Sequence, residues 1–280
     1  MGDIKLFVCC HRPFSVPNHP LLVPIQVGAT LADSHFPGFI HDDTGDNISQ
    51  KNRSYCELTA QYWTWKNANA DYYGFFHYRR YLYPDLTAKP PYRIERAPDA
   101  DVLDRLEFDR MQEVVPQYDM LCPIGENMHI SVREHYAHAP FHHKEDLELI
   151  EDIIREMYPS FVAAMEQHLS GTICYFGNMY IMSKPLFLDY CAWLFPILDE
   201  FDRRADLTGY SQQELRVDGY LAERLFGVYY THRKEELRTL ELPRVHFVPD
   251  RMQRWNQKLT CALLPPGSKR RSIAKRWKRR

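Results

Sequence analysis

Two arginines and a histidine stand together at the end of an apolar segment. His77, Arg79 and Arg80 end the run YYGFFHYRR, so charge begins where a buried strand is expected to stop. A guanidinium pairs with two phosphate oxygens at once, and histidine adds a further donor. The cluster predicts an anion site. An edge strand with arginines that are solvated, or paired with Glu57 or Asp71, is the alternative that chemistry alone leaves open.

The same region is rich in aromatic side chains. Residues 55–83 hold 11 of the 38 aromatic residues of the chain. Aromatic rings pack against the C–H faces of sugars while neighbouring polar groups satisfy the hydroxyls. This density favours a carbohydrate substrate.

Two later segments offer further groups for such a substrate. Gly177 allows a ligand to approach the backbone, and the Asn178 amide both donates and accepts hydrogen bonds; a hairpin turn is an equally good interpretation. On the helix expected after Ser211, Glu223 lies one turn from Gly219 and Tyr220 and would suit a general base in an aromatic pocket. An exposed or arginine-paired glutamate is the ordinary alternative.

Signatures of other chemistries are absent from the sequence. The loop 42–47 carries three aspartates, which could hold Mg²⁺ or Mn²⁺ but are also common in turns. No D-x-D follows an expected strand, and no G-x-G-x-x-G, P-loop, G-x-S-x-G or H-E-x-x-H motif occurs. The seven cysteines form no C-x-x-C pair, which predicts reduced and mostly buried thiols.

Charge is distributed unevenly along the 280 residues. Residues 269–280 hold eight Lys/Arg and no acid, whereas the rest carries 27 basic and 37 acidic residues. An acidic body argues against nucleic-acid binding, and the tail predicts docking on an anionic membrane surface. The N-terminus lacks signal-peptide features, and no apolar stretch is long enough to span a bilayer. We expect a cytoplasmic protein, peripheral on the inner face of the plasma membrane.

Hydrophobic patterns predict a single domain over 1–268 followed by the basic tail. Strands are expected over 4–10, 21–29, 72–83, 118–124, 172–183 and 245–249. Helices are expected from Ser54, where Glu57 completes a capping box, over 101–115, 144–168 and 185–201, and from Ser211, where Glu214 completes a second one. Alternating strands and helices predict an α/β fold with a mainly parallel sheet covered on both faces.

Several of these segments together resemble a known family. The order and spacing of N-I-S (47–49), the 55–67 helix, H-Y-R-R-Y (77–81), G-N-M-x-I-M (177–182) and G-Y-L-A-E-R-L (219–225) are similar to a bacterial family of unknown function from capsule, exopolysaccharide and O-antigen gene clusters. The resemblance covers about residues 4–250. It implies a GT-A-like (Rossmann-like) fold and a glycosyltransferase that uses a nucleotide-diphospho-sugar, with some relatives linked to galactose or galactofuranose transfer.

The resemblance also implies roles for individual residues. His77, Arg79 and Arg80 would occupy the place where other GT-A enzymes hold a metal, so a divalent cation is not favoured and no metal ligand is assigned. The other expected residues are His11, Gly28, Ala29 and Asn47 for the nucleotide; Gly177, Asn178, Tyr220 and Trp65 for the sugar or acceptor; and Glu223, with Asp218 as its competitor, for the catalytic carboxylate.

The expected function is transfer of a sugar from a UDP-sugar to a lipid-linked or growing glycan. Two other functions remain open from the sequence. One is a phosphate-ester hydrolase or phosphotransferase that uses the His/Arg cluster, and the other is a glycan-binding scaffold without turnover.

Overall fold

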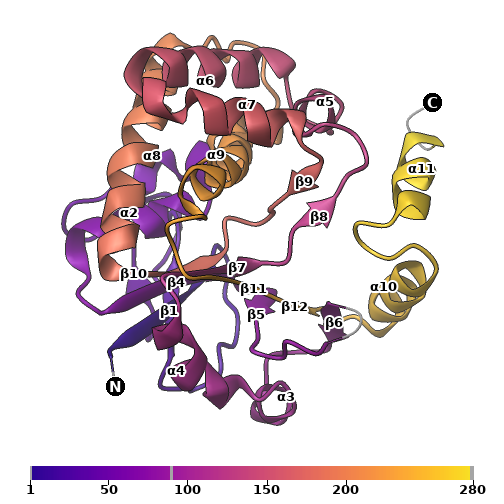
Figure 1. Ribbon diagram of the computed structural model, residues 1–280. Helices are drawn as coiled ribbons and strands as arrows, with labels where there is room; N and C mark the ends of the chain where they lie inside the picture. The colour runs from indigo at the N-terminus through magenta and orange to yellow at the C-terminus, as the bar shows by residue number, and fades with distance from the viewer. Residues whose placement is uncertain (1, 89–90, 278–280) are drawn as a thin grey trace.

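A computed structural model describes residues 2–88 and 91–277, with side chains as far as Ala274 (Figure 1). Most of its strands belong to one central sheet. The strands are β1 (Ile4–Cys10), β2 (Leu22–Gln26), β3 (Ile40–His41), β4 (Tyr72–His77), β5 (Arg80–Leu82), β6 (Tyr92–Glu95), β7 (Met120–Pro123), β8 (Glu126–Asn127), β9 (Ile173–Cys174), β10 (Tyr180–Ser183), β11 (Thr239–Leu242) and β12 (Arg244–Phe247).

The central sheet is mixed but mostly parallel. Its order is β11-β7-β10-β4-β1-β2-β3, and β10 alone on this path runs against its neighbours. A small extension, in which β12 pairs with β5 and β6, continues from the end of β4. Two short strands, β8 and β9, pair separately. The predicted α/β fold with a mainly parallel sheet flanked by helices is confirmed.

Helices cover both faces of this sheet. They are α1 (Asn52–Tyr55), α2 (Leu58–Asn67), α3 (Ala100–Arg105), α4 (Met111–Val114), α5 (Val132–Ala137), α6 (Lys144–Met157), α7 (Val162–Ser170), α8 (Lys184–Arg204), α9 (Val217–Arg233), α10 (Arg251–Leu263) and α11 (Lys269–Trp277). Figure 1 shows α6 to α9 on one side of the sheet and α3 and α4 on the other.

The first strand shows why helices must pack on both faces of the sheet. Side chains alternate between the faces of a strand. Phe7 and Cys9 therefore join the core beneath α8 and α9, whereas Leu6, Val8 and Cys10 join the core beneath α3 and α4. A strand buried on both faces reads as a continuous apolar run, which is why 4–10 is recognisable in the sequence.

Several predicted elements differ from the structure. The 101–115 helix is divided into α3 and α4, and the 72–83 strand is divided into β4 and β5. The 144–168 helix is two helices, because Pro159 disfavours a helical conformation at Tyr158 and has no N–H to donate. The 54–67 helix is interrupted at Cys56, whose φ is +51°. The segment 172–183 is not a hairpin, since β9 pairs with β8 and β10 pairs with β4 and β7.

Helices α10 and α11 form a C-terminal arm beside the body of the fold (Figure 1). The arm follows β12 and packs near β6 and β8: the Tyr92 hydroxyl donates to the Cys261 carbonyl at 2.9 Å, and the Ser272 hydroxyl donates to the Met128 carbonyl at 3.1 Å. The predicted basic tail makes up its second half, as far as it is described.

Candidate active site

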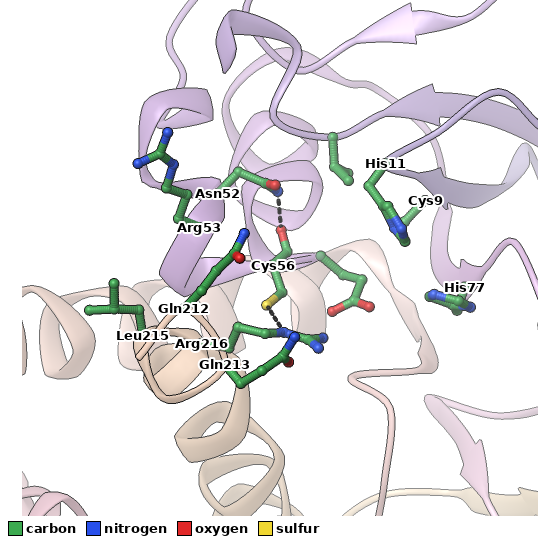
Figure 2. A pocket seen from close by; sticks show the side chains of 12 residues that line it. Cys9, His11, Asn52, Arg53, Cys56, His77, Gln212, Gln213, Leu215 and Arg216 are labelled. Carbon is green, nitrogen blue, oxygen red and sulfur yellow. Dashed lines mark hydrogen bonds between the residues drawn. The ribbon is translucent and has the colours of Figure 1, made fainter. Parts of the chain in front are cut away.

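A pocket of about 620 Å³ opens at the carboxyl ends of β1, β2 and β4 (Figure 2). These strands are parallel neighbours in register, with Cys9 opposite both Ile25 and His77, so their last residues meet at one edge. This edge is where open α/β sheets bind ligands. The pocket is lined by Cys9, His11, Val27, Asn52, Arg53, Cys56, Glu57, His77, Gln212, Gln213, Leu215 and Arg216.

The break between α1 and α2 brings Glu57 into the pocket. Ser54 lies inside α1 and hydrogen-bonds Asp218 of α9, and the Glu57 side chain makes no capping bond. The predicted Ser54–Glu57 capping box is therefore wrong, because the left-handed Cys56 ends α1 one residue before Glu57. The Ser211–Glu214 box is confirmed, with Ser211 N–H donating to Glu214 at 2.7 Å and Glu214 N–H to Ser211 Oγ at 3.4 Å.

Glu57 is the carboxylate of the pocket. Burial raises the pKa of Glu57, and the negative charge of Glu223 raises it further. A hydrogen bond from its own backbone N–H and the positive charges of Arg216 and Arg80 partly counteract this increase. A carboxylate with a raised pKa, facing guanidinium groups in a cleft, is a candidate for proton transfer.

Arg216 closes the pocket opposite α1. It ends the short turn Glu214–Arg216 before α9, and its Nε–H donates to Cys56 Sγ at 3.4 Å, as Figure 2 shows. Burial raises the pKa of the Cys56 thiol to about 12 and that of Cys9 well above its usual value. Both thiols stay protonated at neutral pH, so neither is an activated nucleophile.

His77 stands at the end of β4 as a neutral donor. Burial, with the charges of Arg80 and His11, lowers its pKa to about 3. Its Nδ1 accepts the Arg79 N–H at 3.2 Å, so the proton of the neutral ring sits on Nε2. The His11 ring centroid lies 6.2 Å from that of His77, and burial and nearby arginines lower its pKa as well.

The two adjacent arginines point to different places. Arg79 is exposed, and its guanidinium lies over the Tyr78 ring, 5.2 Å from the centroid, with Arg12 at 5.1 Å. Arg80 is half-buried, and its charge lowers the pKa values of His77 and Glu57. It also lies near Gly177, since its Nη1 is 3.7 Å from the position that a Cβ on this glycine would take. Of the predicted cluster, His77 lines the pocket and neither arginine does, but Arg80 lies on the side of His77 and Glu57 whereas Arg79 lies on Tyr78.

Glu223 fixes the loop between β9 and β10. Its Oε1 accepts the Gly177 N–H at 2.6 Å, and its Oε2 accepts from the buried Arg224 at 2.8 Å. The Asn178 side chain donates to the Gly219 carbonyl at 3.0 Å. Gly177 (φ +100°) and Asn178 (φ +48°) thus take a conformation that α9 holds in place.

The segment expected at the nucleotide base is a rigid turn. The N–H groups of Gly28 and Ala29 donate to the buried Asp42 carboxylate at 2.8 and 2.9 Å, and Ser49 Oγ donates to it at 2.6 Å. Gly28 has φ +66° and touches Asn52, so a side chain there would clash. Both residues are buried, and Val27 before them lines the pocket.

The remaining expected residues divide between the pocket edge and other places. Tyr220 lies at the edge, where its hydroxyl donates to the Gln213 carbonyl at 3.1 Å and its ring stacks on His142 at 4.1 Å. Trp65 lies elsewhere and stacks on Phe195 of α8 at 5.7 Å. Asn47 bonds within its own turn, to the Gly45 carbonyl and the Ser49 N–H.

Asp218 is buried beneath the site rather than in the pocket. It hydrogen-bonds Ser54, and its Oδ1 has no partner. Burial, with the nearby Asp202 charge, raises its pKa to about 8. The Asp218 side chain faces α1 and is not among the residues that line the pocket, so it does not reach a ligand there.

Comparison with known proteins supports one assignment. The family profile described as "Domain of unknown function (DUF4422)" matches residues 5–234, most of the chain. The chain belongs to the DUF4422 family. The solved apo structure of WbbM, described as a bifunctional glycosyltransferase, matches with a TM-score of 0.83 and 32% identity over 88% of this chain. The match covers 45% of the WbbM chain, so the DUF4422 chain spans less than half of that protein. No curated protein matches significantly.

The aspartate loop of this DUF4422 chain does not converge on one point. Asp42 is turned inward, Asp43 pairs with His35 at 2.8 Å, and Asp46 accepts from Tyr62 at 3.3 Å. Within the described residues, His35, His41 and Asp43 form a group whose ligand atoms are close enough for a metal. Of these three, Asp43 lies on this loop, and none lines the pocket.

Glu57 and Arg216 are the pocket residues that the sequence did not single out for chemistry. Glu57 was hidden by the capping pattern, and Arg216 lies just before the 219–225 segment, whose members drew the roles. The usable signal was their position: Glu57 lies in the 55–67 segment of the family resemblance, and Arg216 lies close to the 219–225 segment. Only the contact between α1 and the 212–216 segment shows that they face the same cavity.

Proposed function

We propose that this DUF4422 chain is a glycosyltransferase that moves a sugar, such as galactose or galactofuranose, from a UDP-sugar to a glycan or lipid-linked glycan in surface-polysaccharide assembly. The observation that carries the proposal is the pocket at the carboxyl ends of β1, β2 and β4, which Arg216, His11 and His77 line together with the carboxylate of Glu57. The similarity to WbbM supports the reaction class.

The diphosphate is proposed to bind between Arg216, Arg80 and His77. The guanidinium groups supply fixed positive charge, and the Nε2–H of the neutral His77 ring donates without a charge of its own. Negative charge grows on the diphosphate as the bond from sugar C1 to its oxygen breaks. Donors that are already in place stabilise that charge without reorganisation. The uracil base of the UDP-sugar would extend toward Val27 and the Gly28–Ala29 turn.

Glu57 is proposed to accept the proton of the attacking hydroxyl. The acceptor oxygen forms the new bond to C1, its proton passes to Glu57, and UDP leaves toward the arginines. The raised pKa of Glu57 makes it a stronger base than an exposed glutamate. Glu223, the residue expected from the sequence, already accepts two hydrogen bonds, which suits it to hold Gly177 in position.

The acceptor is proposed to approach over Tyr220. Its ring, stacked on His142 and linked to Gln213, offers a flat apolar surface at the pocket edge. A sugar ring packs on such a surface through its C–H face.

A thermal-shift screen of nucleotides, nucleotide-sugars and free glycans tests this function. A ligand at a hundred times its Kd adds about 2.7 kcal/mol to the free energy of unfolding. Stabilisation by UDP and a UDP-sugar, followed by UDP release when acceptor is added, supports a transferase. A response to glycans alone would contradict it in favour of a scaffold, and release of inorganic phosphate in favour of a phosphate-ester hydrolase.

A further inference from the structure

Helix α10 carries an apolar face that the described part of the chain leaves uncovered. Met252, Trp255, Leu259 and Leu263 recur at helical spacing and are 67%, 61%, 44% and 62% exposed. None of the 13 residues of α10 is buried. These four residues are called the apolar stripe below. Contiguous exposure of large apolar side chains marks an interaction surface.

Hydrogen bonds to the body fix the direction in which this stripe faces. Arg254 donates to the carbonyls of Val248 and Pro249 at 2.7 and 3.0 Å, and Tyr92 donates to the Cys261 carbonyl at 2.9 Å. Beyond α10, His129 Nε2 bonds the Gly267 carbonyl at 2.9 Å. The side of the arm that carries these bonds faces the protein, so the apolar stripe is turned outward.

The charge of the arm indicates what covers the stripe. Residues 251–280 contain 11 Lys/Arg and no acid, whereas residues 1–250 contain 24 Lys/Arg and 37 Asp/Glu, a net charge of −13. On α10 itself, Arg251 and Lys258 are exposed basic residues, whereas Arg254 donates to the body. An apolar stripe with basic flanks is the pattern of a helix that lies in the interface of an anionic bilayer. Tryptophan, here Trp255, favours that depth.

We propose that α10 is an interfacial membrane helix, which inserts the apolar stripe among the acyl chains of an anionic phospholipid bilayer. Arg251 and Lys258 of α10 and the exposed Lys269 and Arg270 of α11 contact the lipid phosphates. This proposal adds an apolar contact on α10 to the docking predicted for the basic tail. Ile273 of α11 adds an exposed apolar side chain, and the side chains of 275–280 lie outside the described residues. None of the described helices is long and apolar enough to cross a bilayer.

Sedimentation of the full chain with vesicles tests the proposal. The probes are vesicles of phosphatidylcholine alone and of phosphatidylcholine with one quarter phosphatidylglycerol. We expect partitioning onto the anionic vesicles that is at least about tenfold stronger and that weakens as NaCl is raised, because salt screens the basic side chains. A chain that stays in the supernatant with both vesicle types overturns the proposal.

Variants separate the apolar stripe from charge alone. Trp255→Asp and Leu259→Asp should each reduce partitioning about tenfold or more, because a charge in the apolar contact opposes insertion. Leu188→Asp, at an exposed leucine of α8, is the matched control and should partition as the unchanged chain does. Thermal unfolding checks that each variant is folded. Equal partitioning of all three variants overturns the proposal. A dimer that Leu259→Asp dissociates in lipid-free light scattering overturns it in favour of a second copy of the chain.

Discussion

Glu223 accepts the Gly177 N–H at 2.6 Å while its other oxygen holds Arg224, so this carboxylate ties the β9–β10 loop to α9. Glu57 lies in the neighbouring pocket with no side-chain capping bond. The two glutamates interact electrostatically, yet the structure gives them different surroundings. A base must be within reach of the proton that it abstracts, and on this distinction we propose proton transfer for Glu57 and positioning for Glu223.

Glu57→Gln should lower kcat for sugar transfer about 10²- to 10⁴-fold and leave UDP affinity nearly unchanged, because it removes the proton acceptor but keeps the shape. In the unchanged enzyme, kcat/KM should rise with pH as Glu57 deprotonates, at a pH above that of an ordinary glutamate. Glu223→Gln is the comparison and should cost less, since Gly177 N–H still finds an oxygen. Full transfer by Glu57→Gln together with loss in Glu223→Gln would reverse the assignment.

Arg216→Ala and Arg80→Ala should each lower donor turnover about 10²- to 10³-fold, the range for removing one donor to a developing charge. Arg79→Ala is the matched control, because its guanidinium lies on the exposed side of Tyr78 whereas that of Arg80 acts on His77 and Glu57, and turnover should stay within about fivefold of normal. UDP-sugar consumption measures all three. A large loss in Arg79→Ala with little change in the other two would place the diphosphate on the opposite side of His77.

The residues around His77, Arg79 and Arg80 show which features of the site could be predicted from the sequence and which could not. The strand that ends at His77 was predictable because its apolar run is continuous and then stops at charge. The separation of Arg79 from Arg80 was not, since it depends on the tight connection from β4 to β5 and on the Tyr78 ring. Glu57 was assigned to a cap because the sequence does not reveal the positive φ of Cys56. Local patterns predicted elements, and long-range contacts decided which side chains share the pocket.

Gly177→Ala should impair transfer as well as stability. Its φ of +100° is costly for alanine, about 1–2 kcal/mol, and the new methyl would lie 3.4 Å from Met179 and 3.7 Å from Arg80. Gly209→Ala is the control, with φ +84° and open space around the added atom. Both variants should lose stability in urea unfolding, but only Gly177→Ala should lose transfer activity. Equal transfer activity of the two variants would show that the β9–β10 loop does not contribute to the active site.

The free energy of unfolding of Asp218→Asn, compared with that of the unchanged chain, should increase as pH rises. The folded pKa of Asp218 is raised from 3.8 to about 8, so between these values the folded state holds a proton that the unfolded state has released. Stability therefore falls with rising pH in this window. Relative to the unchanged chain, Asp218→Asn should gain about 3–4 kcal/mol between pH 5 and pH 8. Urea unfolding at both pH values measures the gain. A constant difference in stability between Asp218→Asn and the unchanged chain at the two pH values would contradict the buried-proton account.

A crystal structure of the chain with UDP tests the central claim most directly. The account predicts that the nucleotide occupies the pocket at the ends of β1, β2 and β4, with phosphate oxygens within hydrogen-bond distance of Arg216 and of His77 Nε2. A nucleotide bound elsewhere, or one whose phosphates contact neither of these side chains, would contradict it.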